Sequence, residues 1–395
     1  MTAHYSNRPV SDAELQRRWT AARAAMGEQD IDALLIFGNN DYMTGYGKYL
    51  TDVPATFGYP TTLVFPADDA MSIVAHGPLD SEHAPSPTSP YRGVGRVLTT
   101  SSFSTAFFTN MLDAAQVAKA LKPYASGTVG IAGMMSMPIA MMDWLRSNGF
   151  AATRFVDASD LVDRIKAVKS AEEIDLARET ALLQSRVLEQ VFAQIRPGMT
   201  ENDVAAEAQY RMRLAGSEQG AYLVSSGPMG SCTPLRAPHN HTRTLEAGDQ
   251  LHLLIEANGP GGIYVEIGRV AILGEATASM REQAKFVLGA RHFVLNMLQP
   301  GATGAQIWAS YNEFLAGHGQ PAEQRLFLHG QGYDLVERPL MRPDEPMPLA
   351  AGMVMALHPT VVDATSYSWI CDDYLVTDTG PVRLHDSEER LFELG

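Results

Sequence analysis

Polar, titratable residues gather at the ends of apolar segments in the second half of this chain, each beside Gly or Pro. Carboxylates, imidazoles and thiols are the groups that hold metal ions or move protons. Groups at the ends of several strands are held on a rigid scaffold, so this pattern predicts one site assembled from those ends. The segments that carry it are 237–243, 248–269, 328–339, 352–359 and 370–376.

Each of these residues also has a purely structural interpretation. Glu256 and Glu266 lie in apolar strands joined by a glycine-rich turn, and an unpaired carboxylate is costly to bury there. Each could therefore cap a strand or pair with Arg269. His329 could be a hydrogen-bonded core histidine, and His358 could simply end a strand. The shared pattern, more than any one residue, favours a site.

The elements that must position these residues differ between the two halves of the chain. In the first half a capping box at Ser11 to Glu14 begins a helix, and short apolar runs then alternate with helical stretches. This alternation predicts an α/β domain with a mixed sheet. Strands are expected at 33–37, 61–65, 71–75 and 129–132, and further helices at 112–121 and 138–147.

The second half begins with another capping box, Ser170 to Glu173, and a helix that runs to about residue 195. Strands are expected between 221 and 273, at 354–357 and at 374–377, which indicates an α+β domain with antiparallel hairpins. The half also repeats itself, which predicts two related αβ halves around a pseudo-two-fold axis. Pro-Gly-x-Thr and a later Leu-Ala-Gly occur at 197–200 and 214–216, and again at 300–303 and 315–317.

Composition excludes several classes of protein. The 395 residues include 30 Lys+Arg and 45 Asp+Glu, a net charge of −15, so nucleic acid and anionic membranes are poor partners. Hydrophobic residues make up 45% and charged residues 19%, the reverse of a disordered chain. The 2 cysteines exclude a disulfide scaffold. With no signal peptide or membrane span recognised, we expect a cytoplasmic protein.

An ordered set of motifs over nearly the whole chain resembles the pita-bread superfamily of methionine aminopeptidase, aminopeptidase P, prolidase and creatinase, peptidase family M24. The resemblance implies a creatinase-type α/β domain at 1–160 and an α+β pita-bread catalytic domain at 161–395, in which the repeat is the internal pseudo-two-fold. It also implies a homodimer whose N-terminal domain contributes to the neighbouring site. The motifs are Arg164-Ile165-Lys166, Lys169-Ser170-Ala171-Glu172-Glu173, Gly248-Asp249, Tyr264…Arg269, His329-Gly330-x-Gly332…Glu337-x-Pro339, Gly352-Met353-Val354 and Leu375-Val376-Thr377.

The metal-binding positions depart from the peptidase pattern, in which Asp, Asp, His, Glu and Glu hold two ions. Counting from Gly248 places Leu254 at the first Asp, whereas Glu266 stands at the second and His329 keeps the histidine. His358 and Cys371 replace the two glutamates. Since too few carboxylates remain for two divalent ions, and imidazole suits a transition metal, we expect no metal or one divalent transition-metal ion.

These departures lead to the expectation of an enzyme that is not a peptidase. Creatinase and ectoine-hydrolysing relatives move a proton with the histidine of an Ala-His-Asn segment, which 237–240 resembles. We therefore predict hydrolysis of a non-peptide C–N bond in a small polar metabolite, with His239 as general acid/base. Glu266 or His329 would orient the water or hold the leaving nitrogen, and His358 would complete the catalytic set.

The predicted substrate-binding residues come from two further segments. Phe57 and Tyr59 match the creatinase stretch that supplies an arginine to the substrate carboxylate, and Tyr59 cannot supply that charge. Arg338, beside Glu337, could bind a carboxylate instead, or the two could form a loop ion pair.

Two alternatives stay open. One is a metal-dependent lyase of a small zwitterion such as dimethylsulfoniopropionate, because the lyase branch of the superfamily has a ligand spacing that resembles Glu256, Glu266, His329, His358 and Asp373. The other is a non-catalytic pita-bread binding module, as found in chromatin and ribosome-associated proteins.

Overall fold

The computed structural model describes residues 8–39, 45–55, 58–103, 105–363 and 366–395. The chain divides into two compact units, Met1–Lys166 and Ala167–Gly395. The boundary predicted between residues 160 and 161 falls within helix α5 (Ser159–Ala167) and stays a prediction. Among the described residues, no helix combines the length and the apolarity that a membrane span requires.

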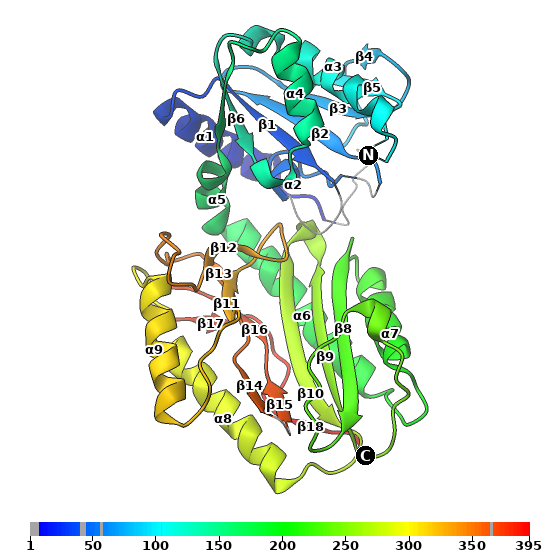
Figure 1. The fold of residues 1–395 in the computed structure, drawn as a ribbon, viewed down its shortest axis with the longest axis vertical. Coiled ribbons are helices and arrows are strands. Elements are labelled where there is room, and N and C mark those ends of the chain that lie inside the picture. Colours follow the sequence, from blue (N-terminus) through cyan, green and yellow to red (C-terminus); the bar gives the residue numbers. More distant parts are fainter. Residues whose placement is uncertain (1–7, 40–44, 56–57, 104, 364–365) are drawn as a thin grey trace. The chain divides into compact units, whose positions relative to one another are not determined.

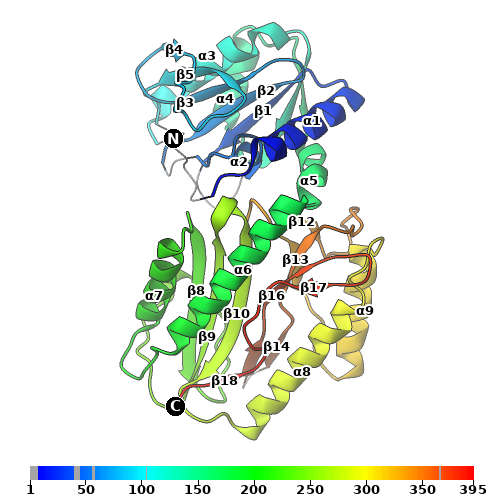
Figure 2. The same cartoon turned by 180° about the vertical axis from the view of Figure 1, so that it is seen from behind.

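Unit 1 is built on a seven-stranded mixed sheet in the order β4-β5-β3-β2-β1-β6-β7. Helices α3 and α4 cover one face of it and α1 lies on the other (Figures 1 and 2). The four predicted strands and three predicted helices are present. The elements are α1 (Asp12–Glu28), β1 (Ala33–Gly38), α2 (Gly45–Thr51), β2 (Thr61–Pro66), β3 (Met71–His76), β4 (Ser81–His83), β5 (Val94–Thr100), α3 (Asn110–Leu121), β6 (Thr128–Ala132), α4 (Ile139–Ser147), β7 (Arg154–Asp157) and α5.

Only half of the predicted first capping box forms. Ser11 Oγ accepts a hydrogen bond from Glu14 N, as the motif requires. The Glu14 carboxylate, however, binds Arg17 and Arg18 on the same helix, at 2.7 Å in each case. Two nearby cations outcompete a single backbone N–H for this carboxylate, because charge-assisted bonds are the stronger ones.

Unit 2 has two sheets, in the orders β18-β10-β9-β8 and β12-β11-β13-β16-β17, and a separate β14–β15 hairpin. The predicted strand at 374–377 begins two residues earlier than expected. The elements are α6 (Ala171–Phe192), α7 (Glu201–Leu214), β8 (Gly220–Pro228), β9 (Asp249–Asn258), β10 (Tyr264–Ile272), α8 (Ala278–Leu295), α9 (Gly304–Gly317), β11 (Leu328–Gly330), β12 (Glu337–Leu340), β13 (Val354–Leu357), β14 (Thr360–Asp363), β15 (Ser366–Trp369), β16 (Asp372–Leu375), β17 (Val382–Arg383) and β18 (Phe392–Glu393).

The internal repeat of the sequence is a repeat of structure. Thr200 and Thr303, which follow the two Pro-Gly pairs, each form a full capping box at the start of a helix, α7 and α9. Each helix follows a longer one, α6 or α8, and precedes strands of one sheet. Side chains of α6 and α7 pack on β8–β10, where α6 lies across the strands (Figure 2), and those of α8 and α9 pack on β11, β13 and β16.

Alternation along the strands leaves one face of each sheet free of these helices. On β9, Leu253 and Ile255 pack against α6 and α7, so Glu256 points to the inner face. On β13, Met355 and Leu357 pack against α8 and α9. The inner faces of both sheets therefore carry the polar residues that the sequence places at the strand ends.

Candidate functional site

Three of the predicted residues form one compact group on these inner faces. Glu266 on β10, His329 on β11 and His358 just after β13 offer one ligand atom each, all within 4.8 Å of one another. Glu266 Oε1 lies 3.8 Å from His329 Nε2 and 3.7 Å from His358 Nε2. These separations exceed hydrogen-bond length, and ligand atoms about 3.5 Å apart are what metal–ligand bonds of about 2.1 Å and tetrahedral angles produce.

Strand register, and not the count from Gly248, decides which carboxylate faces Glu266. In the antiparallel β9–β10 ladder Glu256 lies directly opposite Glu266. Leu254 lies two residues away on the same face and packs with Tyr367 and Trp369 in an apolar cluster. The position predicted from counting therefore belongs to the core, and Glu256 supplies the second carboxylate of the pair.

His329 presents an unprotonated nitrogen to Glu266. His329 Nδ1 lies 3.0 Å from Gly330 O, and because a carbonyl only accepts, Nδ1 carries the proton and Nε2 the lone pair. Burial lowers the pKa of His329 to about 4. Burial, with His329 and Arg325 nearby, holds the pKa of His358 well below its usual range. Both imidazoles are therefore neutral at pH 7, the form that binds metal ions.

The carboxyl groups of the cluster resist ionisation. Burial, together with Asp373, raises the pKa of Glu256 to about 7. Burial and then the neighbouring Glu256 and Asp373 hold the pKa of Glu266 well above its usual range. Gln331 Nε2 donates to Glu256 Oε1 at 3.3 Å. Among the described residues, neither glutamate forms an ion pair with Lys or Arg, so an added cation would stabilise both carboxylates.

Cys371, at the other predicted departure, contacts Glu266 directly. Its thiol donates to Glu266 Oε1 at 2.9 Å and is fully buried, and burial raises the pKa of this thiol well above its usual range. A two-way backbone bridge between Gly268 and Cys371, with both N–H···O distances 3.1 Å, joins the two sheets at this point. A Cβ on Gly268 would lie 2.0 Å from the Trp369 ring, so this junction requires glycine.

The tandem aspartates have opposite surroundings. Asp372 is bound by Arg269 and Arg383, both at 2.8 Å, and by Arg291 at 2.9 Å. Its pKa stays below the usual range because these cations outweigh its burial. Arg269 is thereby committed to Asp372, so the interpretation that it pairs with Glu256 or Glu266 is wrong.

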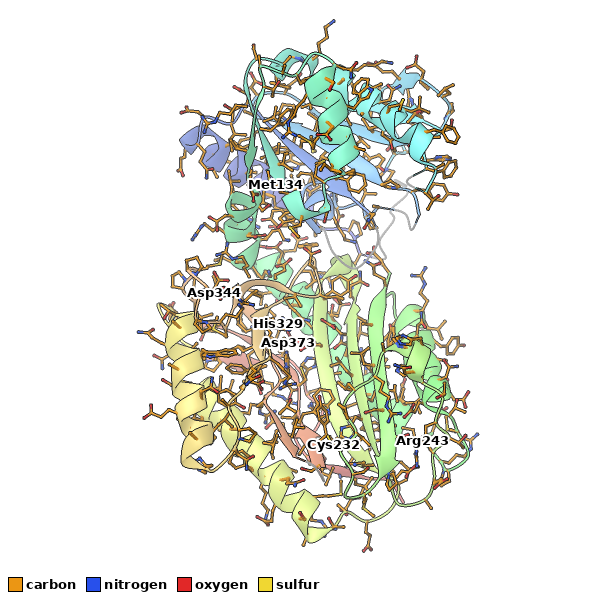
Figure 3. All side chains as sticks on the ribbon, in the orientation of Figure 1. Met134, Cys232, Arg243, His329, Asp344 and Asp373 are labelled. Carbon is orange, nitrogen blue, oxygen red and sulfur yellow. The ribbon has the colours of Figure 1, made fainter. Side chains whose placement is uncertain are left out.

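Asp373 instead faces the cluster. Its Oδ2 accepts from Glu266 N at 2.6 Å, and Oδ1 is buried without a hydrogen-bond partner among the described residues. Figure 3 labels Asp373 and His329, which lie close to one another in the interior of unit 2. Asp373 and Glu256 lie beside the group of three and outside it, so their role as ligands stays a prediction.

The donor set fits one transition-metal ion. A carboxylate and two neutral imidazoles from three different strands match the ligand types of catalytic zinc or non-haem iron sites. The unpartnered Asp373 oxygen adds a further available donor. This composition is consistent with the possible metal-binding group predicted from the sequence, whereas the number of ions is a separate question.

The remaining predicted residues of unit 2 lie elsewhere. His239 is exposed on a short 3₁₀ helix, Pro238–Asn240, and belongs to no metal-type cluster of the described residues. Glu337 binds Lys169 at 2.8 Å, and Arg338 binds Glu345 at 2.5 Å. These contacts bind the two side chains to other parts of unit 2, and the predicted roles of all three residues in substrate chemistry stay predictions.

The predicted aromatic residues lie in unit 1. Tyr59 packs against His76 and Phe103, with ring centroids 4.8 and 6.1 Å away, on an exposed edge. Phe57 lies outside the described residues. A role for either in binding substrate stays a prediction.

Sequence analysis missed His385, which follows β17. Its Nε2 lies 3.3 Å from Asp373 Oδ2, and both side chains are fully buried. His385 has no Gly or Pro beside it, and it stands between Leu384 and Asp386 near the chain end, so the pattern used to find the other residues could not select it.

Comparisons with known proteins match both units. The sequence profile of "Metallopeptidase family M24" matches residues 175–378, and that of the "Creatinase/Prolidase N-terminal domain" matches residues 18–168. These matches, together with structural likeness over nearly the whole chain, confirm the predicted superfamily, the creatinase-type first domain and the pita-bread second domain.

Individual relatives are peptidases. A Xaa-Pro dipeptidase of Pyrococcus furiosus is 24% identical over 275 residues, 67% of this chain and 75% of that protein. The structure resembles that of dipeptidase PepE from Mycobacterium ulcerans, with a TM-score of 0.75, 25% identity, and coverage of 98% of this chain and 99% of that one. For prolidase from Thermococcus sibiricus the TM-score is 0.79 at 18% identity, with coverage of 97% and 100%.

These relatives overturn the function predicted from the sequence. Hydrolysis of a non-peptide C–N bond is wrong, and so are the alternatives of a lyase and of a non-catalytic module, because the relatives are named for the cleavage of dipeptides. The physical error was to infer a different bond from changed metal ligands. His358 and Cys371 change the side-chain types at two positions, and they leave the pita-bread fold of the relatives intact.

Proposed function

Since this chain belongs to metallopeptidase family M24, we propose that it is a dipeptidase that cleaves Xaa-Pro dipeptides. The observation that carries the proposal is the group of Glu266, His329 and His358 on the inner faces of the pita-bread sheets, with ligand atoms within 4.8 Å of one another. The names of the relatives supply the substrate class.

A single divalent transition-metal ion is the cofactor that the site supports best. Glu266, His329 and His358 would hold it. The chemistry that such an ion supplies is Lewis acidity, which stabilises the negative charge that develops on the carbonyl oxygen of a peptide bond under attack. Two imidazoles and one carboxylate add at most one negative charge, and this charge suits one ion better than two.

Substrate reaches the group from the side of Glu256 and His358. Glu266 and His329 are buried, whereas the His358 side chain is 19% exposed and Glu256 is half-buried. A dipeptide that enters from this side meets the Glu256 carboxyl first.

We propose that Glu256 transfers protons, and its position supports this role. Its carboxyl lies directly across the ladder from Glu266 and outside the group of three, and Gln331 holds its Oε1. From there Glu256 can take a proton from the attacking water and return it to the leaving amine, as a carboxyl within reach of both can do. The Cys371 thiol, which donates to Glu266 Oε1, orients that carboxylate.

The assembly is proposed to be a homodimer in which unit 1 contributes to the site of the neighbouring subunit. Exposed apolar side chains on unit 1, among them Phe108, Met135 and Ile139, support it, because a second copy can cover them. We also propose a cytoplasmic location, which the two unpaired cysteines, Cys232 and Cys371, support.

The test is hydrolysis of Xaa-Pro dipeptides by purified protein loaded with Zn²⁺, Mn²⁺, Co²⁺ or Fe²⁺, each assayed before and after chelation. We expect activity that chelator removes, and a loss of about 1,000-fold in kcat/KM in Glu266→Gln, which is the several kcal/mol that metal catalysis supplies. Asp344→Asn is the control, since this exposed carboxylate, which Figure 3 labels, pairs only with Arg342 among the described residues. Protein that cleaves no dipeptide with any of these ions, or a fully active Glu266→Gln, would contradict the proposal.

A further inference from the structure

A third histidine reaches the cluster through one carboxylate. His385 Nε2 lies 3.3 Å from Asp373 Oδ2, and the side chains of both residues are fully buried. The same Oδ2 accepts from Glu266 N at 2.6 Å. His385 therefore contacts the carboxylate that holds the backbone of the central ligand residue, without being part of the ligand group itself.

Helix α6 fixes the other side of the imidazole. His385 Nδ1 lies 3.1 Å from Ala181 O and 3.5 Å from Ser185 Oγ. Because Ala181 O can only accept, Nδ1 is the donor in that bond. Ser185 Oγ in turn accepts from Asp386 N at 3.3 Å, which fixes the chain next to the histidine. The ring is thus held at both nitrogens, by α6 on one side and by β16 on the other.

The bonds of Asp373 leave one oxygen for a ligand. Oδ2 is used by Glu266 N and His385, whereas Oδ1 is buried and has no partner among the described residues. In the strand ladders Asp373 lies opposite Ala356, and Ala356 lies opposite His329, so Asp373 and His329 share one face of the sheet with only a methyl group between them. A buried carboxylate oxygen that lacks a partner on this face is placed for a cation.

We propose that His385 is a positioning residue of the metal centre. Through Asp373 it fixes the backbone of Glu266 and orients the free Asp373 oxygen, so that both carboxylates meet the ion already in place. Partners of this kind, behind the ligands themselves, commonly govern the affinity and geometry of a metal site. The inference rests on the proposed function, because it requires that the cluster binds a metal ion.

Two substitutions of His385 test the roles of its two ring nitrogens separately. In His385→Gln the side-chain amide N–H can reach the place of Nε2 and donate to Asp373 Oδ2. In His385→Asn the amide can replace Nδ1 at Ala181 O, and it is too short to reach Asp373. We expect His385→Gln to keep the Co²⁺ affinity of the wild type, and His385→Asn to bind Co²⁺ about 10- to 100-fold more weakly, with an altered Co²⁺ absorption spectrum.

The matched control is His252, another fully buried histidine of unit 2 with both nitrogens bonded. Trp369 Nε1 donates to its Nδ1 at 2.9 Å, and its Nε2 lies 3.0 Å from Thr233 Oγ1. His252→Asn should destabilise the protein as His385→Asn does and leave Co²⁺ affinity unchanged. If His385→Asn does not fold, Asp373→Asn replaces it in the comparison, with the same expected loss of affinity.

The measurement is competition for Co²⁺ between the purified full-length chain and a chromophoric chelator. Wild-type protein that binds Co²⁺ while His385→Asn, or its replacement, binds it equally tightly would overturn this inference alone. Wild-type protein that binds no Co²⁺ would overturn the proposed function, and the inference with it. These outcomes are distinct, because the first leaves the metal centre intact.

Discussion

Two buried carboxylate clusters lie on either side of β16, and they differ in how their charge is compensated. Asp372 is bound by three arginines, Arg269, Arg291 and Arg383, and Arg291 and Arg383 also pair with Glu389. Every charge there has a partner within the protein. A cluster of this kind holds β10, β16 and α8 together and requires no ligand.

The cluster around Glu266 has the opposite character. Glu256, Glu266 and Asp373 lie near one another, and the described residues that contact them are histidines, a glutamine and a thiol, with no arginine or lysine. Burial is the largest cause of the raised pKa values of Glu256 and Glu266, and neighbouring carboxylates add to it, whereas for Asp373 burial outweighs the contact with His385. Uncompensated buried acids are costly, so the difference indicates which cluster stabilises the fold and which one binds a cation.

We expect the largest effect on the free energy of unfolding at Asp372, in the cluster whose charge the arginines compensate. Asp372→Asn removes one charge and leaves three arginines around a neutral amide, so we expect the free energy of unfolding to fall by about 3–5 kcal/mol. Denaturant titration in the presence of chelator measures it. A loss below about 1 kcal/mol would show that the arginine cluster is not what holds these elements together.

We expect an intermediate effect on the free energy of unfolding at His252, a buried neutral histidine, and this effect depends on pH. Burial lowers the pKa of His252 to about 3. The unfolded chain therefore binds more protons than the folded one between about pH 3 and pH 6.5, so stability falls as the pH drops through that window. Between pH 7 and pH 5 the wild type should lose about 2 kcal/mol more than His252→Asn. Equal losses, from denaturant titrations at both pH values, would contradict burial of a neutral imidazole.

We expect the smallest effect on the free energy of unfolding at Glu266, in the cluster without arginine or lysine, and there the substitution stabilises the protein. Glu266→Gln removes an ionisable group that is crowded by Glu256 and Asp373. We expect the metal-free protein to gain about 1 kcal/mol in the free energy of unfolding at pH 8. The same denaturant titration, run beside Asp372→Asn, checks it. If both variants lost equal stability, the two clusters would not differ as described.

The fold could be predicted from local patterns to a large extent. The capping boxes at Ser170, Thr200 and Thr303 are visible in the sequence because their residue types are fixed by backbone hydrogen bonds three residues apart. The duplicated Pro-Gly-x-Thr segments predicted the two halves of unit 2 for the same reason. Helix α5 was missed, because the stretch it occupies was interpreted as a boundary.

The site depends on pairing across strands, which the sequence does not encode locally. Glu256 rather than Leu254 faces Glu266 because of the β9–β10 register, and a count from Gly248 cannot detect a shift of two residues. Asp372 differs from Asp373 in its surroundings because it contacts three arginines from distant segments of the sequence. His385 lies in a segment that has no strand-end pattern. Residue types at Glu266, His329 and His358 were sufficient to find those three as candidates.

The central claim is that the uncompensated cluster holds one transition-metal ion on which hydrolysis depends. Elemental analysis of the purified, metal-saturated chain tests it most directly, with His358→Ala and Asp344→Asn as the matched pair of variants. The account predicts one ion per chain in the wild type and in Asp344→Asn, and a loss of that ion together with dipeptidase activity in His358→Ala. Two ions per chain, no ion in an active protein, or full occupancy in His358→Ala would contradict it.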